Sequence, residues 1–103
     1  MDVVHILPTN NTPEIYLNPK GIIKIKGRAI DESRTKFSEQ LYSWVDDYIL
    51  HPSESTEVTI ALEYLNSFNS IILASALKKL AQINNQDNKL AYLLYILLGI
   101  DEY

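Results

Sequence analysis

Few residues in this chain have types and spacings that could support chemistry, and the most informative lie in residues 63–70, Glu-Tyr-Leu-Asn-Ser-Phe-Asn-Ser. Here a segment typical of a buried strand leads through a polar turn into the start of an expected helix. The first turn of a helix has unpaired backbone N–H groups and carries the positive end of the helix dipole. A phosphate group on Ser67 or Ser70 could be held there. Phosphorylation would add roughly −1.5 to −2 charges and three acceptor oxygens, which would alter any surface that docks on this end of the sheet.

The same turn also has a purely structural interpretation. Asn66, Ser67 or Asn69 has the kind of side chain that caps a helix N-terminus by accepting a backbone N–H, and capping is compatible with phosphorylation. Phe68 and Ile71 could form an exposed apolar patch suited to a protein partner, although such residues also often belong to the core or to a hydrophobic staple.

Other residues that often perform catalysis lack the required arrangement. The chain has no cysteine, so it offers no thiolate nucleophile and no thiolate zinc site. His5 and His51 lack the H-x-x-x-H spacing of a metal site, and we expect both at the surface. The 3 glycines are too dispersed for a phosphate-binding loop, and carboxylates adjacent in sequence diverge on a helix or strand. We therefore expect no catalytic residues, no metal site and no cofactor.

The composition is that of one folded domain. The chain has 103 residues, of which 47% are hydrophobic and 21% are charged, so residues 1–103 are expected to share one core. The net charge of −4 disfavours nucleic-acid binding, which requires a basic surface. The N-terminus lacks the basic segment of a signal peptide, and the longest apolar run, residues 90–100, is about half of the ~20 residues that span a membrane. We expect a cytoplasmic protein that binds neither nucleic acid nor membranes.

The first half of the chain predicts a hairpin followed by a helix. Residues 14–17 are expected to form a strand that passes through a turn at 18–21 into a second strand at 21–26. Gly27 either ends this second strand or introduces a bulge. Between residues 33 and 50, apolar side chains recur with helical spacing, which predicts an amphipathic helix that ends before a proline. The apolar stripe of this helix consists of Phe37, Leu41, Trp44, Val45, Tyr48 and Ile49.

The second half predicts a strand, a helix and a last strand. After a polar loop at 53–57, residues 58–65 are rich in β-branched and aromatic types, which is typical of a central strand. A second helix follows the turn at 66–70 and ends near residues 84–85. Its apolar stripe consists of Leu73, Ala76, Leu77, Leu80 and Ala81. Residues 90–98 are apolar throughout, which favours a strand buried on both faces, although a short buried helix has the same periodicity.

The resulting element order is β-β-α-β-α-β. Each helix then connects two strands that can lie parallel through a right-handed crossover. The sequence therefore predicts an α/β single domain, with a mixed sheet and helices packed on it.

Four groups of residues form a pattern when they are taken in order. They are Thr12-Pro13-Glu14-Ile15, then Gly21-Ile22-Ile23-Lys24-Ile25-Lys26-Gly27-Arg28, then Glu32, Phe37 and Trp44, and finally Leu62-Glu63-Tyr64-Leu65-Asn66-Ser67. In this set, over roughly residues 9 to 80, the chain resembles the SiaC family of regulatory phosphoproteins. That family is similar in fold to STAS-domain anti-sigma-factor antagonists, so the resemblance implies a STAS-like domain. The apolar residues 90–98 depart from the aromatic and acidic C-terminal segment of the family.

The resemblance implies a small bacterial regulatory protein without catalytic activity. Ser67 matches the family position that a dedicated Ser/Thr protein kinase phosphorylates and a PPM-type phosphatase dephosphorylates, and Ser70 is the alternate acceptor. In the family the unphosphorylated form binds and activates a diguanylate cyclase, so the switch controls cyclic-di-GMP signalling and biofilm formation. The candidate partner-binding residues are Tyr64, Asn66, Phe68, Asn69, Arg28 and Glu32.

Two other functions are compatible with the sequence. One is a constitutive interaction module, or a homodimer, that docks through a sheet edge or through residues 90–98 and is never phosphorylated. The other is a small-ligand carrier with a pocket at the carboxyl ends of the strands, for which the sequence shows no convergent polar residues.

Overall fold

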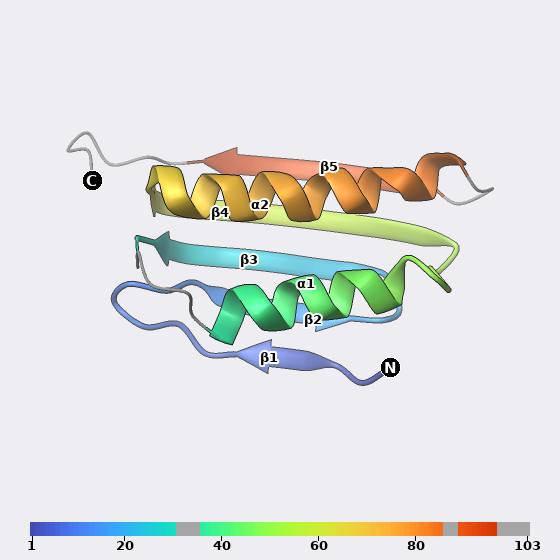
Figure 1. Ribbon diagram of the computed structural model, residues 1–103, viewed down its shortest axis with the longest axis horizontal. Helices are drawn as coiled ribbons and strands as arrows, with labels where there is room; N and C mark the ends of the chain where they lie inside the picture. The colour runs from blue at the N-terminus through green and yellow to red at the C-terminus, as the bar shows by residue number, and fades with distance from the viewer. Residues whose placement is uncertain (31–35, 86–88, 97–103) are drawn as a thin grey trace.

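The protein consists of a five-stranded mixed sheet with two helices on one of its faces (Figure 1). The computed structural model describes residues 1–30, 36–85 and 89–96, and the side chains at 1–30 and 38–83. The strands lie side by side in chain order, as β1 (Val4–Ile6), β2 (Glu14–Asn18), β3 (Ile22–Ala29), β4 (Ser55–Leu65) and β5 (Lys89–Ile96). The first three strands pair antiparallel, whereas β3, β4 and β5 are parallel.

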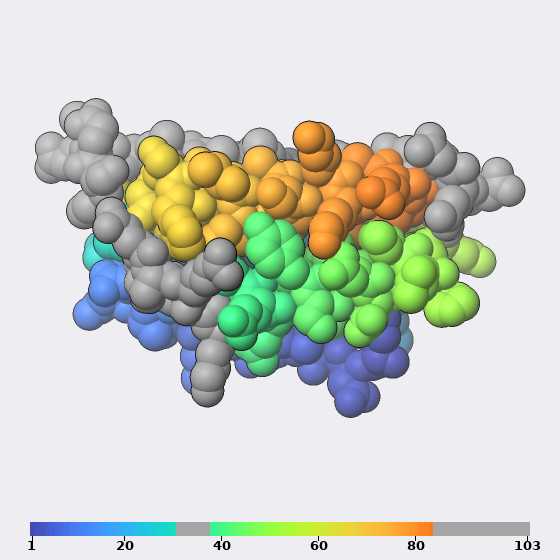
Figure 2. Space-filling model, viewed as in Figure 1, coloured from blue at the N-terminus to red at the C-terminus, as the bar shows by residue number. Residues whose placement is uncertain are grey.

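Two helical crossovers connect the parallel strands. The first contains α1 (Lys36–Tyr48), and the second contains α2 (Ser67–Leu80) followed by the 3-10 helix η1 (Ala81–Asn85). Two crossovers of the same hand that progress in one direction along a sheet place both helices on the same face. Figure 1 and Figure 2 show α1 and α2 packed next to each other across that face.

One hydrophobic core fills the space between the helices and the sheet. The apolar stripe predicted for the first helix is confirmed at Leu41, Trp44, Val45 and Tyr48, which are all buried. Ile49 is partly buried against the core just after the helix, and the side chain of Phe37 lies outside the described residues. Strand residues with alternate spacing complete this cluster, namely Ile15, Leu17, Ile23, Ile25, Val58, Ile60 and Leu62. Residues between them point to the opposite side of the sheet, because successive side chains of a strand alternate in direction.

The predicted element order is confirmed from β2 to β5, including the parallel pairing of the last three strands. Residues 89–96 form a strand and not a helix, while residues 97–98 lie outside the described part of the chain. The first helix is described from Lys36 onward, and the predicted residues 33–35 before it lie outside the described part.

The structure also corrects the prediction in four places. A short edge strand, β1, precedes the hairpin, and the sequence analysis missed it because its three residues depend on pairing with β2. Strand β4 begins at Ser55 within the predicted polar loop, and α2 begins directly at Ser67 without a separate turn at 66–70. Ala81 is exposed at the C-cap of α2 and does not belong to the apolar stripe.

Two glycines allow the chain to bend where the sheet requires it. Gly21 closes the hairpin with φ +101, and its N–H donates to the Asn18 carbonyl at 2.9 Å. A β-carbon at Gly21 would collide with the Ser55 carbonyl oxygen. Strand β3 continues through Gly27, at φ +118, so Gly27 does not end the strand. The register with β4 shifts by one residue between Gly27 and Arg28, with the extra residue in β4.

Tyr48 generates a first testable prediction. Its ring is 0% exposed, its hydroxyl shares a hydrogen bond of 2.7 Å with Thr56 Oγ1, and the Ser53 N–H donates to it at 3.1 Å. We expect Tyr48→Phe to lower the free energy of unfolding by about 1 to 3 kcal/mol, because buried partners lose their hydrogen bonds. Urea denaturation measures this loss. Tyr42→Phe is the matched control, since the Tyr42 hydroxyl is only part-buried and donates to the Ile72 carbonyl at 3.3 Å. An equal loss in both variants would contradict the prediction.

Candidate functional site

Two asparagines attach the start of α2 to the end of β3. Asn66 is the N-cap, and its side-chain oxygen accepts the Asn69 backbone N–H at 2.9 Å. The Asn66 amide nitrogen donates to the Ile30 carbonyl, and the Asn69 amide nitrogen donates to the Ala29 carbonyl, both at 2.9 Å. Asn69 Nδ2 also lies 2.8 Å from Asn66 Oδ1, which joins the two side chains. We call Asn66 and Asn69 the asparagine clamp.

The clamp decides between the alternatives that the sequence left open for this turn. Asn66 is the N-cap, as one of the three predicted possibilities, and the cap leaves Ser67 as the first helical residue. Asn66 and Asn69 are only 5% and 1% exposed, so their effect on any partner is indirect, through the position of the turn. Their assignment as partner-binding residues remains a prediction.

The two candidate acceptor serines differ in exposure and in hydrogen bonding. Ser67 is exposed, and its hydroxyl makes no hydrogen bond to any residue in the described part of the chain. Ser70 is half-buried, and its hydroxyl donates to the Ser67 carbonyl at 2.8 Å. The Ser67 hydroxyl is therefore open to solvent, whereas the Ser70 hydroxyl is bound to the helix backbone.

A groove between the two helices begins beside this turn. It has a volume of about 260 Å³ and is lined by Ser38, Glu39, Tyr42, Phe68 and Ile72. On the outer side of α2, Ile71 is 66% exposed, one turn after Ser67 on the same side of the helix. Of the two residues predicted to form an apolar patch, Phe68 is half-buried at the groove and Ile71 faces solvent. Their joint use as a partner-binding patch remains a prediction.

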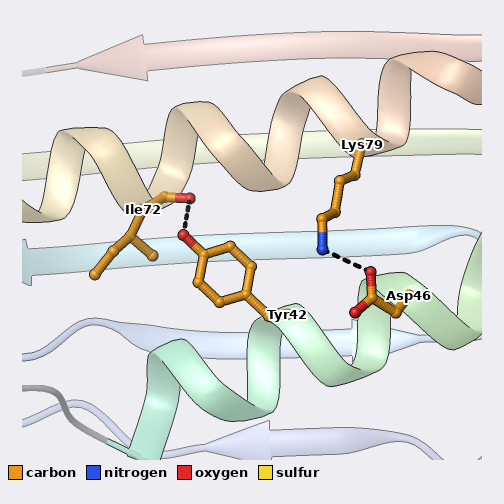
Figure 3. A network of polar contacts seen from close by, with 4 residues as sticks. All are labelled: Tyr42, Asp46, Ile72 and Lys79. Carbon is orange, nitrogen blue, oxygen red and sulfur yellow. Dashed lines mark hydrogen bonds and ion pairs between the residues drawn. The ribbon is translucent and has the colours of Figure 1, made fainter.

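Polar contacts connect α1 and α2, the two helices that form this groove. The Tyr42 hydroxyl donates to the Ile72 carbonyl at 3.3 Å, and the Lys79 ammonium lies 2.7 Å from Asp46 (Figure 3). The same ammonium lies 5.4 Å from the centre of the Tyr42 ring, within the range of a cation–π contact. Neither Tyr42 nor Glu39 was among the predicted site residues. Tyr42 borders the apolar stripe of the predicted helix, whereas no signal in the sequence marks Glu39.

Arg28 and Tyr64 lie at the same end of the sheet, but on its other face. The register shift opposite Gly27 leaves Glu63 as an extra residue in β4, so that Tyr64 pairs with Arg28. The Arg28 guanidinium lies 5.1 Å from the centre of the Tyr64 ring and 3.7 Å, through Nε, from the Glu63 carboxylate. Glu32 lies outside the described part of the chain.

The described residues hold few other candidates for chemistry. Both histidines are exposed, as predicted, and His5 Nε2 lies 2.7 Å from a Glu14 carboxylate oxygen. Across the described residues, no three potential metal ligands lie together. Neither described helix has the length and hydropathy that a membrane-spanning helix requires.

The family comparison decides the identity of this domain. The family model described as "SiaC family regulatory phosphoprotein" matches residues 6–93. The chain belongs to the SiaC family. This match extends at both ends beyond the residues whose pattern carried the resemblance, and no curated protein sequence matches closely enough to add a relative.

Solved SiaC structures confirm the fold. The apo crystal structure of SiaC from Pseudomonas aeruginosa and a second SiaC structure from that organism each match with a TM-score of 0.82 and 21% identity, covering 91% of this chain and 78% of theirs. A chain in the structure of the diguanylate cyclase SiaD in complex with its activator SiaC matches with a TM-score of 0.77 and 21% identity, covering 86% and 74%. The mixed sheet with its two helices is thus a SiaC fold, and it is compatible with the STAS-like architecture implied by the sequence.

The asparagine clamp generates a second prediction. We expect Asn69→Ala to lower the free energy of unfolding by about 1 to 3 kcal/mol, because two buried hydrogen bonds are lost. Asn69→Asp should cost more, since it places a carboxylate against the Ala29 carbonyl. Ser70→Ala is the control and should change stability by less than about 0.5 kcal/mol. Thermal and urea unfolding test the order, and an Asn69→Asp variant as stable as the wild type would refute the role of the clamp.

Proposed function

We propose that this protein is a non-catalytic, cytoplasmic regulator that binds a diguanylate cyclase and is switched by phosphorylation of Ser67. Membership of a regulatory phosphoprotein family supports the proposal, as does the complex of the P. aeruginosa family member with the cyclase SiaD. A Ser/Thr protein kinase and a PPM-type phosphatase would set the phosphorylation state, and cyclic-di-GMP output and biofilm formation would follow from it.

The single observation that carries the proposal is the position of Ser67. It is the exposed first residue of a 14-residue helix whose start is fixed by the clamp. The Asn69 N–H is already satisfied by Asn66, whereas no described residue accepts the N–H groups of Ser67 and Phe68. A phosphate on Ser67 would find these two N–H donors and the positive end of the helix dipole, so the phosphorylated state is locally stabilised.

The surroundings of Ser67 explain how a phosphate would release a partner. Ile71 exposes apolar surface one turn away, and Phe68 lines the neighbouring groove. A partner that covers this surface would have to desolvate the dianion, which is costly unless it supplies matching cations. Glu39 on the groove wall carries a further negative charge, which adds to the desolvation cost of covering this surface. Phosphorylation would therefore favour the unbound state.

Phosphorylation at Ser67 is tested by intact-mass spectrometry of the protein purified from its native host. We expect an addition of ~80 Da that fragmentation places on residue 67, and that is absent from Ser67→Ala but retained in Ser70→Ala. A phosphate that persists undiminished in Ser67→Ala would move the switch to another residue. A chain that stays unmodified in all growth conditions, while still binding its cyclase, would instead favour the constitutive interaction module.

Cyclase docking on the α2 surface is tested with two matched variants. Ile71→Glu should weaken binding of the unphosphorylated protein to the diguanylate cyclase of the same genome at least about tenfold, because it places a charge in the expected contact. Leu50→Glu is the control, since Leu50 is equally exposed, at 69%, but lies beyond the end of α1. Calorimetry measures both affinities. Equal affinities for the two variants would show that the cyclase docks elsewhere.

A further inference from the structure

The face of the sheet opposite the helices carries an ordered set of charges. Strand β3 buries Ile23 and Ile25 under the helices, so residues 22, 24, 26 and 28 lie on the uncovered face. Three of these four residues are basic, in a protein whose net charge is −4. A basic row along one strand is therefore a local feature that the overall charge conceals.

Some charged groups on this face form ion pairs, and others do not. On one side, the Glu14 carboxylate lies 2.7 Å from His5 Nε2, and at the end of the strand Arg28 lies 3.7 Å from Glu63. Lys24 and Lys26 form no ion pair with any described residue. In the register of the sheet, Lys24 lies between Tyr16 and Thr59, two uncharged neighbours. Lys26 lies between Ala61 and Glu14, and the Glu14 carboxylate is paired with His5. The two central ammonium groups are thus available to an external anion.

A groove on this face adds apolar surface to the two charges. It has a volume of about 360 Å³ and is lined by His5, Glu14, Tyr16, Ile22, Lys24 and Lys26. The Tyr16 ring is held edge-on to His5, with a distance of 5.8 Å between ring centres. Aromatic and aliphatic groups beside two free cations are typical of a surface that binds an acidic segment carrying an apolar side chain.

The spacing of the lysines limits what can bind. Residues two apart on a strand are separated by about 6.6 Å, which matches alternate carboxylates of an extended peptide. A small anion on exposed lysines would gain little, because an exposed ion pair contributes only about 0 to 1 kcal/mol. An extended peptide would make several such weak contacts at once, so their contributions would add. Nucleic acid is disfavoured because the net charge of this protein is negative. We propose that this groove binds an extended acidic segment of a partner protein, with its carboxylates on Lys24 and Lys26 and an apolar side chain between Tyr16 and Ile22.

This surface is separate from the one assigned to the phosphorylation switch. It lies on the opposite face of the sheet from α2, and it uses none of the residues that line the groove between the helices. Failure of the Ser67 switch would therefore leave this proposal intact, and the reverse also holds.

The test uses a synthetic peptide of about eight residues in which glutamate alternates with leucine, titrated into the isotopically labelled full chain. We expect the amide signals of Tyr16, Ile22, Lys24 and Lys26 to shift, and the affinity to fall as salt is added. Lys24→Glu/Lys26→Glu should weaken binding at least about tenfold, because two attractions become repulsions. Lys24→Gln/Lys26→Gln, which avoids placing a new carboxylate opposite Glu14, should weaken it severalfold.

The matched control is Lys20→Glu/Lys78→Glu, which changes the net charge by the same amount at two exposed lysines outside the groove. Its affinity should stay within about twofold of the wild type. Three results would each overturn the proposal: no shifts on the uncovered face, equal weakening in the control, or equal binding of a peptide with glutamine in place of glutamate. Sedimentation showing a dimer that Lys24→Gln/Lys26→Gln dissociates would assign the face to self-association instead.

Discussion

The hydrogen bonds between the asparagine clamp and the end of β3 determine which residues of α2 face solvent. The Asn66 and Asn69 side chains donate to the carbonyls of Ile30 and Ala29 where β3 ends, and the Asn66 backbone N–H also donates to the Ala29 carbonyl at 3.2 Å. This contact fixes the rotation of α2 about its axis. With Asn69 turned inward, the helical period places Ser67 and Ile71 outward. Exposure of the candidate acceptor therefore follows from a buried polar contact and not from the serine itself.

The order of the strands imposes a second constraint. Because both crossovers progress in the same direction, the two helices share one face, and the described part of the chain leaves the other face uncovered. Strand β3 therefore carries apolar side chains on the covered face and mostly polar side chains on the uncovered face. Its isoleucines enter the core, while Lys24 and Lys26 extend from the uncovered side. The alternation of isoleucine and lysine that predicted a strand is the same pattern that creates the basic row.

Sequence periodicity predicts the longer helices and strands, but neither their exact ends nor the short strand β1. The stripe of α1 and the alternation of β3 repeat over several turns or pairs, so chance matches are rare and both predictions are confirmed. Strand β1 has three residues and gains its stability from pairing with β2, a tertiary contact that no local pattern encodes. For the site, the sequence indicated that one of three residues caps α2. Only the structure shows that Asn69 also turns inward to the Ala29 carbonyl, because that contact spans 40 residues.

A reversible switch requires that modification should change a surface without changing the fold. The side chain of Ser67 meets this condition, since no described residue depends on its hydroxyl, whereas the hydroxyl of Ser70 is bonded to the helix backbone. The effect of a phosphate should also remain local. Lys26 and Lys24 lie three and five residues before Ala29, about 10 and 16 Å along the strand, and charges are screened over about 10 Å at 0.1 M salt. The clamp end of the sheet and the lysine groove can therefore respond to different partners, because the charge state of one is screened from the other.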